Sequence, residues 1–546
     1  MIQITAIDGL MLREMVLAGT ALLEKNREKV DALNVFPVPD GDTGTNMSLT
    51  MASATKELNA KEYLNASDAA AALAKGALRG ARGNSGVITS QLYRGFSRAL
   101  EGVEKITPPQ FAAALKSGAD TAYKAVMRPK EGTILTVARV VADDAIRQAQ
   151  IAPDDFDALF TTILNSGEAI LARTTDMLPA LKQAGVVDAG GRGLLLIYAG
   201  YAAALRGEHI DNVQAAVDQD NIKPEFVDDH DSIEEFKFAY CTEFSIRNIR
   251  KSAKETDLDM FRRQLNRIGD RVLVAGDLMK GIKAHVHTND PGKALQCGQM
   301  LGDLVDLKVE NMAETRKAKT PAAEEVPPKP YGMVAVSLGD GFSTIFKDLA
   351  VDLIVEGGQT MNPSIEDIQQ AIDKVNAETV FVLPNNGNVI LAAQQAAELC
   401  KRRVLVVPTK NVTMGIAAVV AFQPDLSPED NAQRMDEAAQ KVRTGTITYA
   451  VRDSEIETMH IAQGDIIGLH NGKVSVKADN VHDVAIELMK EIVTEDDGLI
   501  TLYYGQDTKE EDAQALAAEL EEQYPDCDVE VQQGGQPLYY YLIAVE

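Results

Sequence analysis

Two aspartates separated by one residue, Asp40 and Asp42, are the side chains of this sequence best suited to bind a metal ion. They lie in the run Asn34-Val-Phe-Pro-Val-Pro-Asp-Gly-Asp-Thr-Gly-Thr-Asn-Met47, whose Pro and Gly residues indicate a loop. Two such carboxylates can face one hard cation, and Mg²⁺ prefers oxygen ligands while keeping water or phosphate in its other positions. The run predicts a metal-nucleotide site, and an Asp-Gly turn before a capped helix is the alternative.

A helical pattern follows this loop, and we expect Thr43, Thr45 or Asn46 to cap the helix. Backbone N–H groups and the positive end of the helix dipole would then lie near a phosphate.

A second loop, Gly80-Ala-Arg-Gly-Asn-Ser-Gly86, also precedes a helix, expected over 87–100. Its glycines leave the backbone N–H groups open to phosphate oxygens, although it lacks the Lys-Ser/Thr ending of a P-loop. Tight packing between two helices is the alternative for this loop. Arg79 and Arg82 face either phosphate or acidic protein surface.

These loops must be positioned by helices, because apolar residues recur at helical intervals from Ile7 to about Leu205. Polar or Gly-rich breaks occur at residues 37–45, 80–86, 128–132 and 185–193, and a helical pattern follows each one. Four loops at helix N-termini in one domain favour a nucleotide pocket over four unrelated turns.

The composition narrows the functional class. The chain has 546 residues, a formal net charge of −27 and 45% hydrophobic residues. The acidic balance opposes binding to nucleic acid or to acidic membranes. We expect a soluble, cytoplasmic protein, because there is no apolar run long enough to span a bilayer, no secretion signal and no Cys-x-x-Cys spacing among four cysteines.

The predicted fold class is multidomain α and α/β. We expect an all-helical domain at 1–205, a linker at 206–232, a small α+β domain at 233–312, a second linker at 313–330 and an α/β domain at 331–546. Alternating apolar strands and helical stretches after Tyr331 favour a parallel sheet.

His285 and His287 lie on a predicted strand of the middle domain, so both imidazoles project to one face. Cys241, on another strand, would complete a Cys/His/His set suited to Zn²⁺. A pair of hydrogen-bonded strand histidines with a free cysteine is the alternative.

Several of these motifs together resemble the nucleotide-binding loops of the dihydroxyacetone kinase L-subunit family. The matching segments are Asp40-Gly-Asp42 with Gly44-Thr-Asn46, Gly83-Asn-Ser-Gly86, Glu131-Gly-Thr133 and Asp188-Ala-Gly-Gly191. The longer string Leu33–Met47 resembles the bacterial fatty acid kinase A family, and that resemblance runs through all three domains.

The resemblance implies an α-helical barrel that holds ATP and two Mg²⁺ ions. Asp40 and Asp42 would hold Mg²⁺, and Arg82 and Arg192 are candidates to reduce repulsion between two anions. A further acidic ligand of the glycerone kinase family corresponds here to Val35, which leaves the third protein ligand open. The nucleotide-binding candidates are Asn34, Thr43, Gly44, Thr45, Asn46, Gly83, Asn84, Ser85, Gly86, Thr133, Asp188 and Gly190.

The other domains carry their own resemblances. Tyr240–Phe244 and Lys283–Gly292 are similar to the middle domain of fatty acid kinase A, which implies dimerisation and a structural zinc site at Cys241, His285 and His287, with Glu243 as a candidate partner. Gly357–Ser364 resembles a string of DegV-type fatty-acid-binding proteins, with Ser364 the expected cap of a helix. It implies a DegV-like C-terminal domain used for docking or regulation.

The resemblance implies ATP-dependent phosphorylation of a fatty acid carboxylate, presented by a separate DegV-type protein, to give acyl phosphate and ADP. A glycerone kinase-type enzyme acting on a small hydroxyl substrate is one alternative. A non-catalytic scaffold gated by nucleotide is another. The resemblance to fatty acid kinase A also implies a homodimer.

Overall fold

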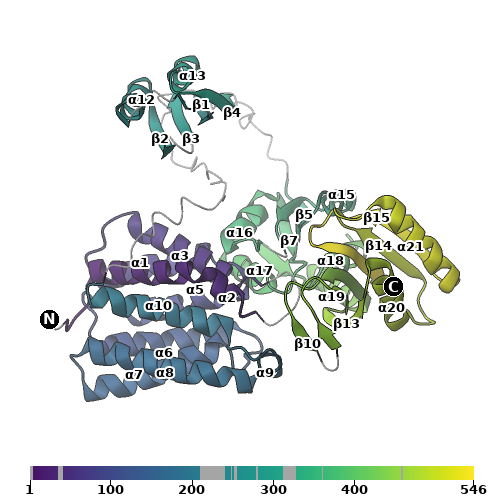
Figure 1. The fold of residues 1–546 in the computed structure, drawn as a ribbon, viewed down its shortest axis with the longest axis horizontal. Coiled ribbons are helices and arrows are strands. Elements are labelled where there is room, and N and C mark those ends of the chain that lie inside the picture. Colours follow the sequence, from purple (N-terminus) through teal and green to yellow (C-terminus); the bar gives the residue numbers. More distant parts are fainter. Residues whose placement is uncertain are drawn as a thin grey trace. The chain divides into compact units, whose positions relative to one another are not determined.

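The computed structural model describes residues 4–34, 41–208, 240–247, 249–250, 255–277, 281–311, 327–358, 361–456 and 459–546. The chain forms two compact units (Figure 1). One is Asn221–Pro327, and the other combines Met1–Asp220 with Pro328–Glu546. Much of the predicted linkers at 206–232 and 313–330 lies outside the described residues.

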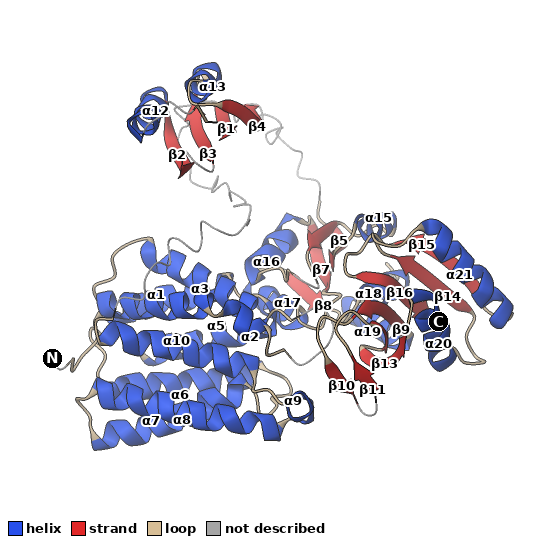
Figure 2. Cartoon of the chain, in the orientation of Figure 1, coloured by secondary structure: helices blue, strands red, loops and turns tan. Residues whose placement is uncertain are grey.

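The described residues up to Leu205 form helices and connecting loops, as the periodicity predicted (Figure 2). The helices are α1 (Gly9–Lys25), α2 (Arg27–Asp31), α3 (Thr43–Asn59), α4 (Ala66–Arg79), α5 (Gly83–Ala99), α6 (Pro108–Ala125), α7 (Ile134–Ile151), α8 (Phe156–Met177), α9 (Pro179–Ala184) and α10 (Ala189–Leu205).

One apolar core runs through this helical region, built from the faces that the helical period aligns. Phe111 is fully buried and meets Phe96 edge to face at a centroid distance of 5.3 Å. Glycines let α1 and α10 approach closely, since a Cβ at Gly200 would lie 2.5 Å from the backbone nitrogen of Gly19. This packing fixes the helix ends, and therefore the loops that precede them.

The four predicted loops lead into helices: α3, α5, α7 and α10 begin at Thr43, Gly83, Ile134 and Ala189. The predicted helix start at residue 87 was wrong, because Gly83–Gly86 form the first turn of α5 instead of the end of the loop. Each therefore presents the N-terminal turn of a helix, where backbone N–H groups have no partner in the helix itself.

The smaller unit is an α+β domain. Its elements are β1 (Tyr240–Arg247), α12 (Glu255–Ile268), β2 (Gly269–Asp277), β3 (Gly281–Thr288), α13 (Pro291–Gln299) and β4 (Asp303–Asn311). The strands pair antiparallel in the order β2-β3-β1-β4. Phe244 and Val286 are fully buried on the face that carries the apolar core.

The first half of the C-terminal region is a parallel sheet with the strand order β6-β5-β7-β8. Its elements are β5 (Lys329–Ser337), α15 (Asp340–Asp348), β6 (Leu353–Glu356), α16 (Ile365–Lys374), β7 (Ala377–Leu383), α17 (Ile390–Leu399), β8 (Arg403–Val406), α18 (Val412–Val420) and α19 (Pro428–Lys441). Ser364 caps α16, as predicted, and accepts from the backbone N–H of Asp367.

The second half holds a mixed six-stranded sheet in the order β13-β12-β9-β16-β14-β15, in which β14 and β15 alone pair in parallel. The strands are β9 (Arg443–Tyr449), β12 (Ile466–His470), β13 (Lys473–Ala478), β14 (Leu499–Tyr504), β15 (Asp528–Gln533) and β16 (Tyr539–Val545). The hairpin β10 (Ser454–Ile456) and β11 (Met459–Ile461) and the helices α20 (Val481–Ile492) and α21 (Glu510–Gln523) complete it. The tyrosine run at 539–541 lies on a central strand.

Candidate nucleotide-binding site

The N-terminus of α3 is held by a carboxylate that lies earlier in the chain, on Asp31 at the end of α2. Its Oδ1 accepts from the backbone N–H groups of Gly44 at 2.6 Å and Thr45 at 3.1 Å, and its Oδ2 accepts from the Thr45 hydroxyl at 2.8 Å. Burial nevertheless raises the pKa of Asp31 above its ordinary value, because desolvation outweighs these bonds.

The prediction that Thr43, Thr45 or Asn46 caps α3 was wrong. All three lie within the helix, and the N-cap position is Asp42, whose side chain makes no capping bond. The Thr43 hydroxyl instead donates to Oδ1 of Asn34 at 2.9 Å. Since Asp31 takes the N–H groups of Gly44 and Thr45, this helix end is already occupied by negative charge.

The N-terminus of α5 differs, because its N-cap residue, Arg82, makes no side-chain capping bond. Gly83 has φ +56°, and a Cβ there would lie 2.4 Å from Nδ2 of Asn46 on α3. A Cβ at Gly86 would lie 2.3 Å from the Thr50 hydroxyl. Glycine is therefore required at both positions for the loops of α3 and α5 to meet.

The remaining two loops also meet. Asp188 caps α10 by accepting from the backbone N–H of Gly191 at 2.6 Å, and the N–H of Ile134 on α7 donates to the same carboxylate. Desolvation raises the pKa of Asp188 to about 6, although these bonds oppose the shift. A Cβ at Gly190 would lie 3.2 Å from Ile134. The Thr133 hydroxyl, before α7, donates to the backbone oxygen of Lys130 at 2.9 Å.

Contact between the first turns of α3 and α10 joins the two pairs of loops. A Cβ at Gly193 would lie 2.7 Å from the sulfur of Met47. The N-terminal turns therefore adjoin in the order α5-α3-α10-α7, and residues far apart in the sequence gather at one end of the helical region. Among the described residues, the helix starts that follow the four predicted loops therefore lie next to one another.

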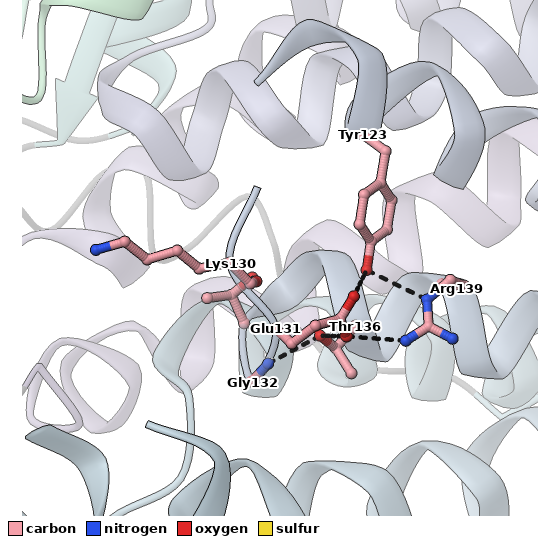
Figure 3. Close-up of polar contacts among 7 residues, drawn as sticks. Tyr123, Lys130, Glu131, Gly132, Thr136 and Arg139 are labelled. Atoms are coloured by element: carbon pink, nitrogen blue, oxygen red, sulfur yellow. Dashed lines mark hydrogen bonds and ion pairs between the residues drawn. The ribbon is translucent and has the colours of Figure 1, made fainter. Parts of the chain in front are cut away.

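A polar cluster fixes the loop before α7 (Figure 3). The carboxylate of Glu131 accepts from the Thr136 hydroxyl at 2.7 Å, from the Tyr123 hydroxyl at 2.9 Å and from Arg139 at 2.8 Å. These bonds, that of Thr136 first, lower the pKa of Glu131. The Thr136 hydroxyl also accepts from the backbone N–H of Gly132, so the turn is held rigidly.

The two candidate cations have protein partners. Arg192 pairs with Glu168 at 2.7 Å. Nη1 of Arg82 donates to the backbone oxygen of Asn362 at 2.9 Å, and its Nη2 lies 3.4 Å from Asp367. Of the two alternatives weighed for Arg82, this structure shows the acidic one.

The donor set suits Mg²⁺ and nucleotide. Hydroxyl, amide and carboxylate oxygens of Asp31, Asn34, Asp42 and Thr43 gather at the start of α3, and α5 begins beside them without a capping side chain. Hard oxygen donors favour Mg²⁺, while open N–H groups favour phosphate. Within the described residues, no group of three His, Cys, Asp or Glu forms a metal-ion cluster. Asp40 and Val35 lie outside those residues.

The backbone of the smaller unit brings the three predicted zinc ligands together. Cys241 on β1 is the register partner of His287 on β3, and Glu243 is the partner of His285. All four positions alternate with Thr242 and Val286, which are buried. Cys241, His285 and His287 therefore belong to one face of the sheet; their side chains lie outside the described part of the chain.

Sequence reasoning missed two residues of this site. Asp31 lies 13 residues before Gly44 and outside the run Asn34–Met47, although a carboxylate shortly before an Asp-Gly-Asp loop was a usable signal. Asn362 donates to Asp42 from the C-terminal region, 320 residues away. No sequence spacing could have indicated that second contact.

The sequence matches three known domain families. Residues 37–203 match the DAK2 domain, residues 237–319 the middle domain of FakA-like fatty acid kinase proteins, and residues 332–546 the C-terminal domain of the same FakA-like proteins. A helical DAK2 domain followed by these two modules indicates that the chain belongs to a class of kinases.

The chain is similar over its full length to the protein YloV of Bacillus subtilis, with 44% identity and complete coverage of both chains. It therefore belongs to the FakA-like family of fatty acid kinase proteins. Similar solved structures include a DegV family protein of Corynebacterium glutamicum (14% identity, 40% of this chain and 97% of that chain, TM-score 0.32). Another is the dihydroxyacetone kinase of C. freundii (13% identity, 41% of this chain and 49% of that chain, TM-score 0.30).

None of the described helices has the length and apolar composition needed to cross a bilayer.

Proposed function

We propose that this chain is the ATP-binding component of a two-component fatty acid kinase that acts in the cytoplasm. A separate DegV-type protein presents the fatty acid, and the γ-phosphoryl group of ATP passes to its carboxylate. The single observation that carries this proposal is the gathering of four helix N-termini, with carboxylates at α3 and an uncapped turn at α5. Membership of the FakA-like family supports a fatty acid as the substrate.

In this proposal Asp42, with Asp40, holds Mg²⁺, and the N–H groups of Gly83–Gly86 hold phosphate oxygens. Thr133 and Asp188 line the nucleotide pocket from α7 and α10. Bound Mg²⁺ supplies positive charge that lowers repulsion between the phosphates and an anionic acceptor. The remaining candidates, such as Thr45 and Asn46, position these groups through their contacts with Asp31 and Gly83.

The acceptor needs no general base, because a fatty acid carboxylate, with a pKa of about 4 to 5, is already ionised at neutral pH. A carboxylate oxygen forms a bond to the γ-phosphorus, and the bond from that phosphorus to the β–γ bridging oxygen breaks. The electron pair of that bond leaves with ADP, and the other product is acyl phosphate. The protein contributes positioning and charge neutralisation.

The assay combines the full chain, a DegV-type fatty-acid-binding protein loaded with oleate, and ATP with Mg²⁺. The expected products are ADP and an acyl phosphate that hydroxylamine traps as the hydroxamate. Phosphorylation of dihydroxyacetone without a lipid carrier would favour a glycerone kinase-type enzyme instead. Nucleotide binding that changes partner affinity without turnover would favour a scaffold.

We also propose a structural Zn²⁺ at Cys241, His285 and His287 in a unit that dimerises. The register pairing of Cys241 with His287 supports this set. Elemental analysis should find one zinc per chain, lost in Cys241→Ala and His287→Ala and kept in the control Cys297→Ala, which changes a cysteine of α13. Equal zinc in all four proteins would refute these ligands.

A further inference from the structure

A small cavity lies between the two halves of the C-terminal region. Ser337 ends β5, and Pro384 and Asn385 follow β7, so the first half contributes the carboxyl ends of two adjacent parallel strands. Gln536 and Tyr539 line the cavity from the second half. The volume of the cavity is about 30 Å³. Its walls therefore come from both halves of the region.

The cavity lies at the edge of the parallel sheet where α/β proteins usually bind ligands. In the strand order β6-β5-β7-β8, the chain passes from β5 to β6 on one side and then returns to β7 on the other. At such a reversal, the loops that follow the two central strands run in opposite directions and leave a crevice between them. Ser337 and Asn385 belong to this crevice, so the topology favours a binding site here.

Two buried side chains that line the cavity each have one polar atom without a hydrogen-bond partner within the described residues. The residues are Ser337, which is 2% exposed, and Gln536, which is 4% exposed. The unpaired atoms are Oγ of Ser337 and Oε1 of Gln536. An unpaired buried polar atom lowers stability, so a molecule that pairs with both atoms would be bound favourably.

The orientation of the Gln536 amide is set by its other end. Nε2 of Gln536 donates to the backbone oxygen of Tyr503 at 3.0 Å, so the carbonyl oxygen is the atom that is left unpaired. The side chain of Asn385, in contrast, is fully engaged. Its Nδ2 donates to the backbone oxygen of Val336 at 2.9 Å, and its Oδ1 accepts from the Thr409 hydroxyl at 2.7 Å. Asn385 therefore forms a fixed wall and leaves recognition to the other two side chains.

Backbone strain is present at the same place. Leu538 has φ +70°, and its neighbours Pro537 and Tyr539 both line the cavity. A leucine in this backbone region is rare. The Thr448 hydroxyl holds it there by donating to the Leu538 backbone oxygen at 2.7 Å. Strain of this kind concentrates at ligand sites, where it keeps the surrounding groups in position.

The lining determines the chemistry of the ligand. Among the described residues that line the cavity, none carries a charge, and Phe342, Val412 and Leu542 supply apolar surface. Oε1 of Gln536 only accepts, so the ligand must donate to it, while the Ser337 hydroxyl can donate to an acceptor. A carboxamide offers both an N–H donor and a carbonyl acceptor.

Size and charge narrow the choice further. A void of about 10–15 Å³ holds one water molecule, so this cavity fits a molecule of the size of acetamide and excludes a long acyl chain. A carboxylate of the same shape would be buried without a cation, which is unfavourable. With a pKa of about 4 to 5, only about one carboxylic acid molecule in a hundred or fewer is neutral at pH 7. The cavity should therefore select an amide over the matching acid.

We propose that this cavity is a binding site for a small uncharged carboxamide. The N–H group of the amide donates to Oε1 of Gln536, and its oxygen accepts from the hydroxyl of Ser337. Since Ser337 belongs to the first half of the C-terminal region and Gln536 to the second, the bound amide joins the two halves. This site does not depend on the proposed phosphoryl transfer.

Ligand-observed NMR of the full chain at pH 7 tests the site with acetamide and with acetate, which has nearly the same shape. We expect saturation transfer to acetamide, with a dissociation constant of about 1–10 mM, as is reasonable for so small a ligand. Acetate should bind at least tenfold more weakly. Acetate binding that equals or exceeds acetamide binding would overturn the proposal, and so would the absence of transfer to acetamide.

A pair of serine variants locates the binding. Ser337→Ala should weaken acetamide binding at least fivefold without lowering the unfolding temperature, because the lost hydroxyl has no partner in the free protein. Ser475→Ala is the control, since it removes another unpaired hydroxyl, on β13, that does not line the cavity. Equal acetamide affinity in the two variants would contradict the site. In crystals soaked with acetamide, density for water alone between Ser337 and Gln536 would overturn it as well.

Discussion

The helix N-termini of α3 and α5 adjoin, yet the protein treats them in opposite ways. At α3, the carboxylate of Asp31 accepts from the N–H groups of Gly44 and Thr45. At α5, the N-cap residue is Arg82, which makes no capping bond. Both turns follow a glycine-containing loop, so the sequence pattern alone does not distinguish them.

The difference assigns a role to each helix end. The carboxylate of Asp31 already neutralises the positive end of the α3 dipole, so a second anion would gain little stabilisation there. The nearby Asp42 adds negative charge, which makes the region suitable for a cation. The first turn of α5 keeps its attraction for phosphate. The two neighbouring turns therefore suit the two parts of a Mg²⁺-nucleotide complex.

The largest expected effect tests the cation side. Asp42→Ala and Asp40→Ala should each lower kcat by about a thousandfold or more, or about 4 kcal/mol, because a metal ligand is lost. The unfolding temperature of Asp42→Ala should fall only slightly, since this variant loses the acceptor of one Asn362 hydrogen bond but no core packing. Asp154→Ala removes an exposed loop carboxylate of the same region and serves as the control. Full activity in either active-site variant would remove the metal assignment.

A second prediction concerns α10, whose N-terminus is also filled by a carboxylate. The pKa of Asp188 is about 6, above the value of 3.8 in the unfolded chain. The folded state therefore binds more protons between these values, and stability is lost as pH rises through that window. The opening free energy of α10, measured by amide exchange, should fall by about 1–3 kcal/mol from pH 4 to pH 7 relative to Asp188→Asn. If the opening free energy of α10 changed with pH in the same way in the unaltered chain and in Asp188→Asn, the prediction would be contradicted.

A third prediction tests the phosphate side. Gly83→Ala should weaken ATP binding by about tenfold, about 1.4 kcal/mol, because its Cβ would collide with Asn46 and displace the start of α5. Gly102→Ala is a matched control, since Gly102 has φ +76° and no atom within 4 Å of a Cβ. It carries the same backbone strain without the collision. Equal ATP affinity in the two variants, by calorimetry, would show that the close approach is unimportant.

The smallest expected effect concerns Asp31. Asp31→Ala leaves the N–H groups of Gly44 and Thr45 without their acceptor and should lower the free energy of unfolding by about 1 kcal/mol, as loss of a helix cap does. Denaturant unfolding compares it with Asp154→Ala, which removes an exposed loop carboxylate and should not change stability. An equal free energy of unfolding in the two variants would contradict this role of Asp31.

Local patterns predicted most of the fold. Helical periodicity located the N-terminal helices, and the alternation of apolar strands and helical stretches after Tyr331 indicated the parallel sheet of β5, β6, β7 and β8. No strand was predicted at β4, β10–β13 or β15, and β15 has only Val529 and Val531 as apolar residues. Such strands are stabilised by neighbouring strands that lie far away in the sequence, and a local window does not contain that information.

The candidate site was predictable to the same extent. The four loops were located because Gly, Asp and Thr gather before helical patterns. The capping of α3 was wrong, because Thr43 is adjacent in sequence while Asp31 is adjacent in space. The contact of Asn362 with Asp42 arises from packing between two regions, each of which has its own local pattern.

The most direct test is a crystal structure of the full chain with Mg²⁺ and a non-hydrolysable ATP analogue. We predict Mg²⁺ on Asp42 and phosphate oxygens on the N–H groups of Gly83–Gly86, while the carboxylate of Asp31 stays on Gly44 and Thr45. Phosphates bound at α3 in place of Asp31, or a metal remote from Asp42, would contradict it.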